Sequence, residues 1–112
     1  MNNITFDDFM KVEICVGTIL TAEINNNLNN PAIVLTIDFG KEIGIKKSSA
    51  QLIANYTCDS LINKQILAVI NFPPRQVGKI ISEVLVLGLA DNNSQPVLIS
   101  PDFYIKDGKK LY

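Results

Sequence analysis

The chain has 112 residues, of which 47% are hydrophobic, and its formal net charge is -1. This length suits one domain with a sizeable core, and the small net charge argues against a protein that coats nucleic acid through bulk charge. The start of the chain, from Met1 to Asp8, is acidic and polar and therefore unlike a secretory signal. No apolar run approaches the ~20 residues that span a bilayer. We therefore expect one cytoplasmic domain over residues 1–112, without membrane insertion.

The first third of the chain predicts one helix and two strands. Residues 5–10 form a short helix capped by Thr5, with acidic residues in its first turn. Residues 12–24 are rich in strand-forming side chains, and Gly17 predicts a bulge or bend within this strand. The asparagine-rich stretch 25–31 is typical of a loop, and residues 32–39 alternate as a strand with one apolar face.

The remaining elements continue this pattern of short strands. A strand over 41–46 follows the turn at Gly40, and Ser48 or Ser49 caps a helix over 48–56. Further strands are expected at 64–71, 82–88 and 97–100, with 73–79 a loop because proline cannot donate to a sheet. The order predicts an all-β OB-fold, a five-stranded Greek-key barrel with one inserted helix and short N- and C-terminal extensions.

The sequence lacks the groups on which most catalysis depends. It has no histidine, the commonest general base and transition-metal ligand. Cys15 and Cys58 have no activating base or CxxC partner nearby and are interpreted as small apolar thiols, with a disulfide left open. We find no phosphate-binding or nucleophile motif. We therefore expect no catalytic residue, no cofactor and no metal.

Positive charge is concentrated in the middle of the chain. Residues 41–79 carry six Lys or Arg and two acidic residues, or +4, whereas the rest carries four and nine, or -5. A basic centre indicates an anion-binding face, although scattered solvated lysines would give the same count.

Several segments together resemble one family. They are Ile37–Gly40, Glu42–Gln51, Leu61–Gln65, Asn71–Arg75 and Ser82–Gly88. In this order they resemble the tRNA-binding domain family, and most closely its CsaA-type chaperone group. The resemblance implies an OB-fold, a homodimer built with the terminal extensions, no cofactor, tRNA binding, and binding of unfolded or export-destined polypeptides. The chain departs from the family at Cys15, where an arginine is common, and at Ile80-Ile81, where an aromatic residue and a lysine are common.

The family motifs fall on residues suited to RNA. Cations would contact phosphates, and hydroxyl or amide groups would contact bases and 2′-hydroxyls. The expected helix start beside Lys46 and Lys47 would add free N–H groups for phosphate. The candidate RNA-binding residues are Lys46, Lys47, Ser48, Ser49, Gln51, Asn71, Arg75, Lys79, Ser82 and Glu83. The alternatives are that the serines cap a helix, that Asn71 shapes a turn, and that Glu83 pairs with Arg75 or Lys79.

Polypeptide binding requires an exposed apolar groove instead. Its candidate wall comprises Phe72, Pro73, Pro74, Val77, Ile80 and Ile81, unless a partner subunit covers them. The resemblance to the CsaA-type group thus implies a homodimeric, non-catalytic chaperone for tRNA, unfolded polypeptide or both. The alternative is a dedicated tRNA-binding module that assists an aminoacyl-tRNA synthetase in trans.

Overall fold

The computed structural model describes residues 1–26 and 31–112. Strands and two short helices follow one another as α1 Phe6–Met10, β1 Ile14–Asn25, β2 Ala32–Asp38, β3 Ile45–Ala50, α2 Cys58–Leu61, β4 Gln65–Val69, β5 Arg75–Val77, β6 Ile80–Ser82, β7 Leu85–Val86, β8 Gly88–Ala90 and β9 Pro96–Leu98. The expected loop at 25–31 lies mostly outside the described residues, and Asn25 belongs to β1.

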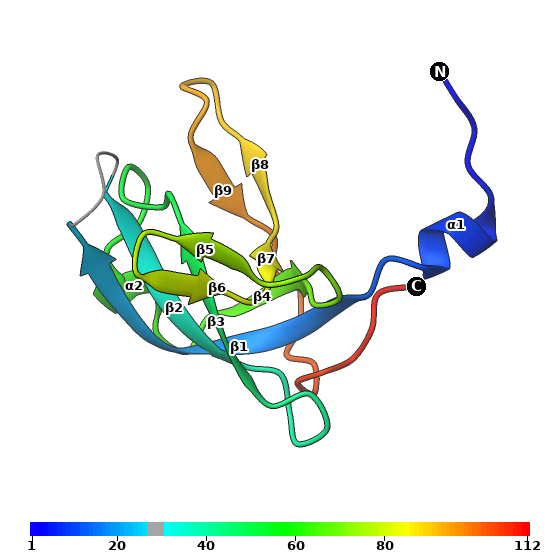
Figure 1. The fold of residues 1–112 in the computed structure, drawn as a ribbon, viewed down its shortest axis with the longest axis horizontal. Helices are drawn as coiled ribbons and strands as arrows, with labels where there is room; N and C mark the ends of the chain where they lie inside the picture. The colour runs from blue at the N-terminus through cyan, green and yellow to red at the C-terminus, as the bar shows by residue number, and fades with distance from the viewer. Residues whose placement is uncertain (27–30) are drawn as a thin grey trace.

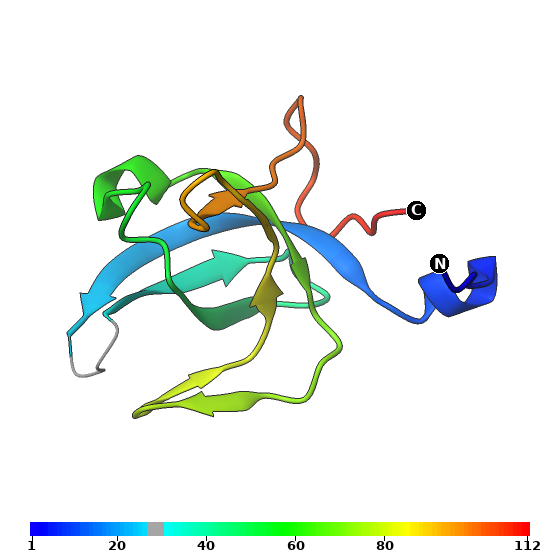
Figure 2. The same ribbon diagram turned by 90° about the horizontal axis from the view of Figure 1, so that it is seen from above.

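Five strands form one strongly curled antiparallel sheet in the order β3-β2-β1-β4-β7 (Figure 1). β1 is long enough to serve both halves of the sheet. Its residues 14–18 pair with β4, and its residues 18–25 pair with β2. This change of partner along one strand lets the sheet curl around its core, which Figure 2 shows from above. The expected all-β, OB-like fold with an inserted helix is confirmed.

The register irregularity of β1 is not at Gly17. The ladder with β4 passes through Gly17 opposite Ile66 without a shift, and the irregularity falls between Ile19 and Thr21. Gly17 is required for another reason, because a Cβ there would lie 2.7 Å from the Ile37 and Phe39 side chains. The glycine permits close packing of the core against β1.

The core lies on the concave side of the curled sheet. Ile19, Leu35, Ile37 and Ile66 are fully buried there, and Leu61 of α2 closes one end. Burying side chains of this size contributes roughly 1.5–3 kcal/mol each. The alternation along β2 predicted this inward face correctly.

The expected strand 41–46 and helix 48–56 are wrong. Residues 41–43 form a turn between Gly40 and Gly44, both at φ +91°, and the strand begins only at Ile45. Ser48 then continues this strand opposite Leu35 of β2. The helix that follows is α2, capped by Thr57. Pairing with β2 overrides the local helix signals of this segment.

The expected loop 73–79 and strand 82–88 are also wrong in detail. After the prolines the chain forms the hairpin β5–β6, which turns at Gly78 (φ +62°). The expected strand at 82–88 is divided among β6, β7 and β8, and the last strand, β9, ends at Leu98. β8 and β9 form a second two-stranded hairpin.

Both termini attach to the start of β1. Thr5 caps α1 through a capping box, as expected. The Asn71 side chain accepts from Glu13 N–H (3.0 Å) and donates to the Lys11 carbonyl (2.7 Å), which joins the end of β4 to the segment after α1. The C-terminal segment runs beside β1, with Val16 N–H donating to the Lys109 carbonyl. Neither helix is long and apolar enough to cross a membrane, among the residues that the structure describes.

Candidate nucleic-acid and polypeptide groove

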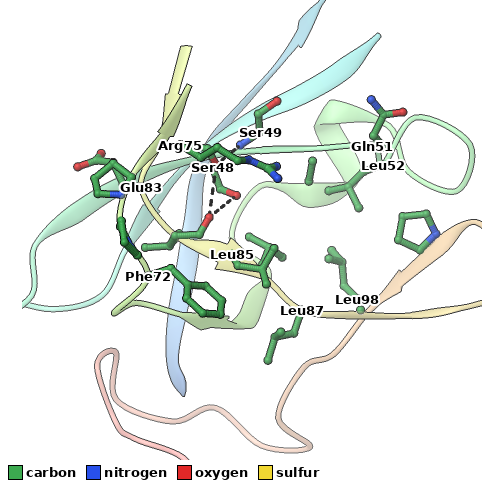
Figure 3. Close-up of a pocket in the computed structure, with 18 residues that line it drawn as sticks. Ser48, Ser49, Gln51, Leu52, Phe72, Arg75, Glu83, Leu85, Leu87 and Leu98 are labelled. Atoms are coloured by element: carbon green, nitrogen blue, oxygen red, sulfur yellow. Dashed lines mark hydrogen bonds between the residues drawn. The ribbon is translucent and has the colours of Figure 1, made fainter. Parts of the chain in front are cut away.

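A groove of about 650 Å³ opens between β3, the segment before β5, and β7 (Figure 3). We call it the central groove. Its lining comprises Ser48, Ser49, Ala50, Gln51, Leu52, Phe72, Pro73, Pro74, Arg75, Ser82, Glu83, Val84, Leu85, Val86, Leu87, Gly88, Pro96 and Leu98. Most of this surface is apolar, with hydroxyl groups, one arginine and one glutamate at one end.

At the polar end of the groove, hydrogen bonds connect the two edges of the sheet. The Glu83 N–H donates to the Lys47 carbonyl at 2.8 Å, and the Lys47 N–H donates to Glu83 Oε1 at 3.0 Å. Ser49 N–H donates to Ser82 Oγ (3.1 Å), and Ser48 Oγ donates to the Val84 carbonyl (3.1 Å). We call these bonds the seam, because they close the sheet where β3 and β7 do not pair as strands in the described chain.

The seam uses several of the candidate RNA-binding groups. Ser48 and Ser82 are buried, and their hydroxyls are already bonded within the chain. Glu83 is held by Lys47 N–H and lies 4.0 Å from Lys46 Nζ. The carboxylate therefore has a structural role, as one alternative predicted, but its partner is Lys46 rather than Arg75 or Lys79.

Asn71 does not line the central groove. Both polar atoms of its side chain bond the segment that follows α1. It therefore shapes the chain before the prolines, as the structural alternative predicted, although it does so through the N-terminal segment.

Three of the candidate RNA-binding cations have exposed side chains and lie on β3 or on the neighbouring β5–β6 hairpin. Lys47 is exposed on β3, Arg75 is exposed at the start of β5, and Lys79 is at the turn of the β5–β6 hairpin. β6 lies against β3, so this hairpin places Arg75 and Lys79 on the β3 side of the molecule. The expected helix start beside Lys46 and Lys47 is absent, because residues 45–50 are strand.

The candidate peptide-binding residues divide into two groups. Phe72, Pro73 and Pro74 line the central groove, and the Phe72 side chain is 51% exposed. Val77, Ile80 and Ile81 belong instead to the hairpin, where Ile81 is 53% exposed.

Sequence reasoning missed much of the apolar lining. Leu52, Leu85, Leu87 and Leu98 were assigned to ordinary helix or strand faces. Their common groove depends on the curl of the sheet and on β9 folding back, so no local pattern marks it.

The cysteines are free thiols, and neither lines the central groove. Burial is the main cause that raises the pKa of Cys15, and the charge of Glu13 adds to it. Within residues 1–26 and 31–112, no group of three or more His, Cys, Asp or Glu could hold a metal ion.

A family model described as "Putative tRNA binding domain" matches residues 14–110. The chain belongs to the tRNA-binding domain family. Over 97% of its length it is 29% identical to a methionine--tRNA ligase of Parabacteroides distasonis. Over 99% of its length it is 31% identical to that of Pyrococcus horikoshii. It spans only 16% and 15% of these ligases.

Solved structures place this tRNA-binding domain in the CsaA-type group. The CsaA chaperone of Bacillus anthracis matches with a TM-score of 0.92 and 41% identity, covering 99% of this chain and 100% of that one. The CsaA chaperone of Picrophilus torridus matches with a TM-score of 0.89 and 46% identity, covering 98% and 100%. A methionyl-tRNA-synthetase-related protein of Pyrococcus horikoshii, 20% identical with a TM-score of 0.88 over 100% of both chains, shares the fold.

Proposed function

We propose that this chain is a cytoplasmic, homodimeric, non-catalytic chaperone of the CsaA type, which binds tRNA and unfolded, export-destined polypeptides at adjoining surfaces. The observation that supports it most is the central groove, whose lining is mostly apolar and includes one arginine, Arg75. An apolar groove suits extended polypeptide, and neighbouring cations suit a phosphate backbone. Family membership supports the tRNA half.

For tRNA, we assign phosphate contacts to Lys47, Arg75 and Lys79. All three side chains are exposed, and they come from β3 and the hairpin that lies against it. Ser49 and Gln51, at the groove edge, are the candidates for bonds to bases or 2′-hydroxyls. Ser48 and Ser82 hold the backbone at this edge of the groove in place through the hydrogen bonds of the seam.

The tRNA assignment is tested by salt dependence. Removing Lys47 and Arg75 together by alanine substitution should weaken tRNA binding. It should also reduce the slope of log affinity against log salt by about 1.8, since each phosphate contact contributes roughly 0.9. Lys11→Ala, which removes one exposed cation on the far α1 side, is the control. An unchanged slope in the double variant would reject this surface as the tRNA site.

For polypeptide, we assign the central contact to Phe72 and Leu85. These groove-lining side chains are 51% and 46% exposed, so a bound segment would cover apolar area that now faces water. Phe72→Ala should weaken binding of a permanently unfolded polypeptide by about ten-fold, which corresponds to partial loss of the ~1.5–3 kcal/mol of a buried large side chain. Phe103→Ala, an equally large truncation at an exposed position outside the groove, should have no effect. Equal losses in both variants would refute the assignment.

The affinities for the two ligands should depend differently on salt concentration. Polypeptide binding to an apolar surface is insensitive to salt or strengthened by kosmotropic salts, whereas tRNA binding weakens steeply. Adding unfolded polypeptide to a tRNA complex should release tRNA if the surfaces overlap.

The homodimer is proposed from the terminal extensions. Figure 1 shows α1 and the C-terminus side by side, projecting from the same side of the sheet. Here Ile4 (71%), Phe6 (69%) and Tyr112 (96%) expose large apolar surfaces. Large apolar side chains that are exposed on neighbouring segments are candidates for a protein contact. Phe6→Ser should lower the sedimentation coefficient toward that of a monomer; an unchanged value would place the contact elsewhere.

A second candidate function is a tRNA-binding module that assists a synthetase in trans. The similarity to methionine--tRNA ligases over nearly the whole chain favours it. This function predicts salt-sensitive tRNA binding without any affinity for unfolded polypeptide, so titration of the wild-type protein with unfolded polypeptide separates the two functions.

A further inference from the structure

A second concave surface lies outside the central groove and shares no lining residue with it. It has a volume of about 650 Å³ and is formed where the β2–β3 turn meets the C-terminal segment. We call it the tail pocket. Its lining comprises Phe39, Gly40, Lys41, Glu42, Ile43, Tyr104, Lys106, Asp107, Gly108 and Lys109. Figure 2 shows the C-terminal segment on the side of the molecule away from the β5–β6 hairpin.

The base of the tail pocket is preformed by two turns in close backbone contact. A Cβ on Gly108 would lie 2.4 Å from the Phe39 carbonyl oxygen, and one on Gly40 would lie 2.8 Å from the Asp107 carbonyl oxygen. Both glycines also have φ above +90°. Only glycine permits this approach, so the distance between the two turns is set by their backbones.

The C-terminal wall is held by one glutamine. Gln65 of β4 bonds both the N–H and the carbonyl of Ile105, and it also donates to Asp107 Oδ1. Thr18 donates to the same carboxylate oxygen at 2.7 Å. Tyr104 and Lys106 therefore flank a fixed backbone position, and the Asp107 carboxylate is already bonded within the chain.

Three lysines, one tyrosine and one glutamate of this pocket face solvent. Lys41, Lys106 and Lys109 are exposed, and Tyr104 is 77% exposed. The ion pairs within residues 1–26 and 31–112 use Lys11, Lys46 and Lys110. The three lysines of the tail pocket therefore have no carboxylate partner among those residues. Glu42 is the other acidic residue of the lining.

We propose that the tail pocket binds one nucleotide of a single-stranded RNA segment, as a second RNA contact distinct from the central groove. Tyr104 is the platform on which a base stacks, and Lys41, Lys106 and Lys109 contact the flanking phosphates. Aromatic platforms beside cations are the usual means of holding single strands. Glu42 accepts from a base amine or a 2′-hydroxyl. This inference rests on the RNA-binding half of the proposed function.

The test is a titration of the whole protein with tRNA and with a short oligoadenylate at several salt concentrations. The variants are Tyr104→Ala and the double variant Lys106→Ala/Lys109→Ala. Tyr104→Ala should weaken oligoadenylate binding by about ten-fold, within the range for loss of one stacked base. The double variant should reduce the slope of log affinity against log salt by about 1.4, at roughly 0.7 per single-strand phosphate. Tyr104→Phe keeps the ring and should bind as the wild type does.

Matched changes elsewhere distinguish the possible failures. Arg75→Ala tests the central groove, and Phe103→Ala removes an exposed aromatic ring that does not line the tail pocket. If Arg75→Ala weakens tRNA binding while the tail-pocket variants bind both RNAs normally, the inference is overturned and the proposed function stands. If only the tail-pocket variants weaken binding, the inference stands and the tRNA assignment to the groove fails. If the wild-type protein binds neither RNA, both fail.

A competing occupant would be the acidic N-terminal segment of a second copy, which carries Asp7 and Asp8. Sedimentation of the double variant detects it. A dimer that dissociates when Lys106 and Lys109 are removed, with unchanged oligoadenylate affinity, would assign the pocket to the partner subunit and overturn the inference.

Discussion

Ser82→Ala is the substitution that best tests the seam. Ser82 is 8% exposed, and its hydroxyl accepts from Ser49 N–H at 3.1 Å and donates to the Val84 carbonyl at 3.4 Å. Alanine removes the acceptor and leaves a half-buried backbone N–H without that partner. Such a loss costs about 1–3 kcal/mol. The Val84 carbonyl keeps its shorter bond from Ser48 (3.1 Å), so the cost is expected in the lower half of that range.

The assay is urea unfolding followed by circular dichroism. With a slope of ~1–3 kcal/mol per molar urea for small proteins, a loss near 1.5 kcal/mol lowers the midpoint by about 0.5–1.5 M. Ser100→Ala changes an exposed serine outside the seam and should leave the midpoint within error. Because the seam also sets the polar end of the central groove, the variant should bind tRNA more weakly. Equal midpoints for the two serine variants would show that the seam does not hold the sheet together.

Three further changes follow from particular contacts. Gly17→Ala should destabilise the fold by about 1–3 kcal/mol, the usual cost of overpacking, because the added Cβ falls 2.7 Å from core side chains; unchanged thermal unfolding would show that the core can yield. Ellman's reagent should modify the half-buried Cys58 before the buried Cys15, whose pKa is raised mainly by desolvation. The stability that the raised Cys15 pKa contributes is fully present below the pKa of the unfolded thiol, and it is lost as the pH rises through the pKa of the folded thiol. A hydrogen bond from the Asn55 side chain is the main cause that lowers the pKa of Asp91. The β8–β9 hairpin should therefore stay ordered above the unfolded Asp pKa of about 3.9 and loosen as the pH falls through the lower folded value. Hydrogen exchange between pH 5 and 2 would measure this loosening, and Asn55→Ala should move it to higher pH.

The central groove illustrates how far local patterns reach. Phe72 to Arg75 of the predicted motif line one groove together with Ser48 and Ser49, whereas Asn71 does not line it. Their individual roles were not predictable, because Ser48 and Asn71 use their polar atoms inside the chain. Whether a hydroxyl or an amide forms its hydrogen bonds within the chain depends on residues distant in sequence. Val84 lies 36 positions from Ser48, and Lys11 lies 60 positions from Asn71.

The sequence by itself determined the all-β class, the inward face of β2, the capped helix at the N-terminus and the family, since each depends on local alternation, capping or motif order. Only the tertiary structure decided that residues 48–50 continue a strand, that the chain after the prolines forms a hairpin, and that Gly17 serves close packing rather than a bulge. It also brought the β2–β3 turn against the C-terminal segment to form the tail pocket. The physical reason is that sheet pairing and side-chain contacts join residues far apart in the chain, and their combined energy exceeds the local preferences that a sequence displays.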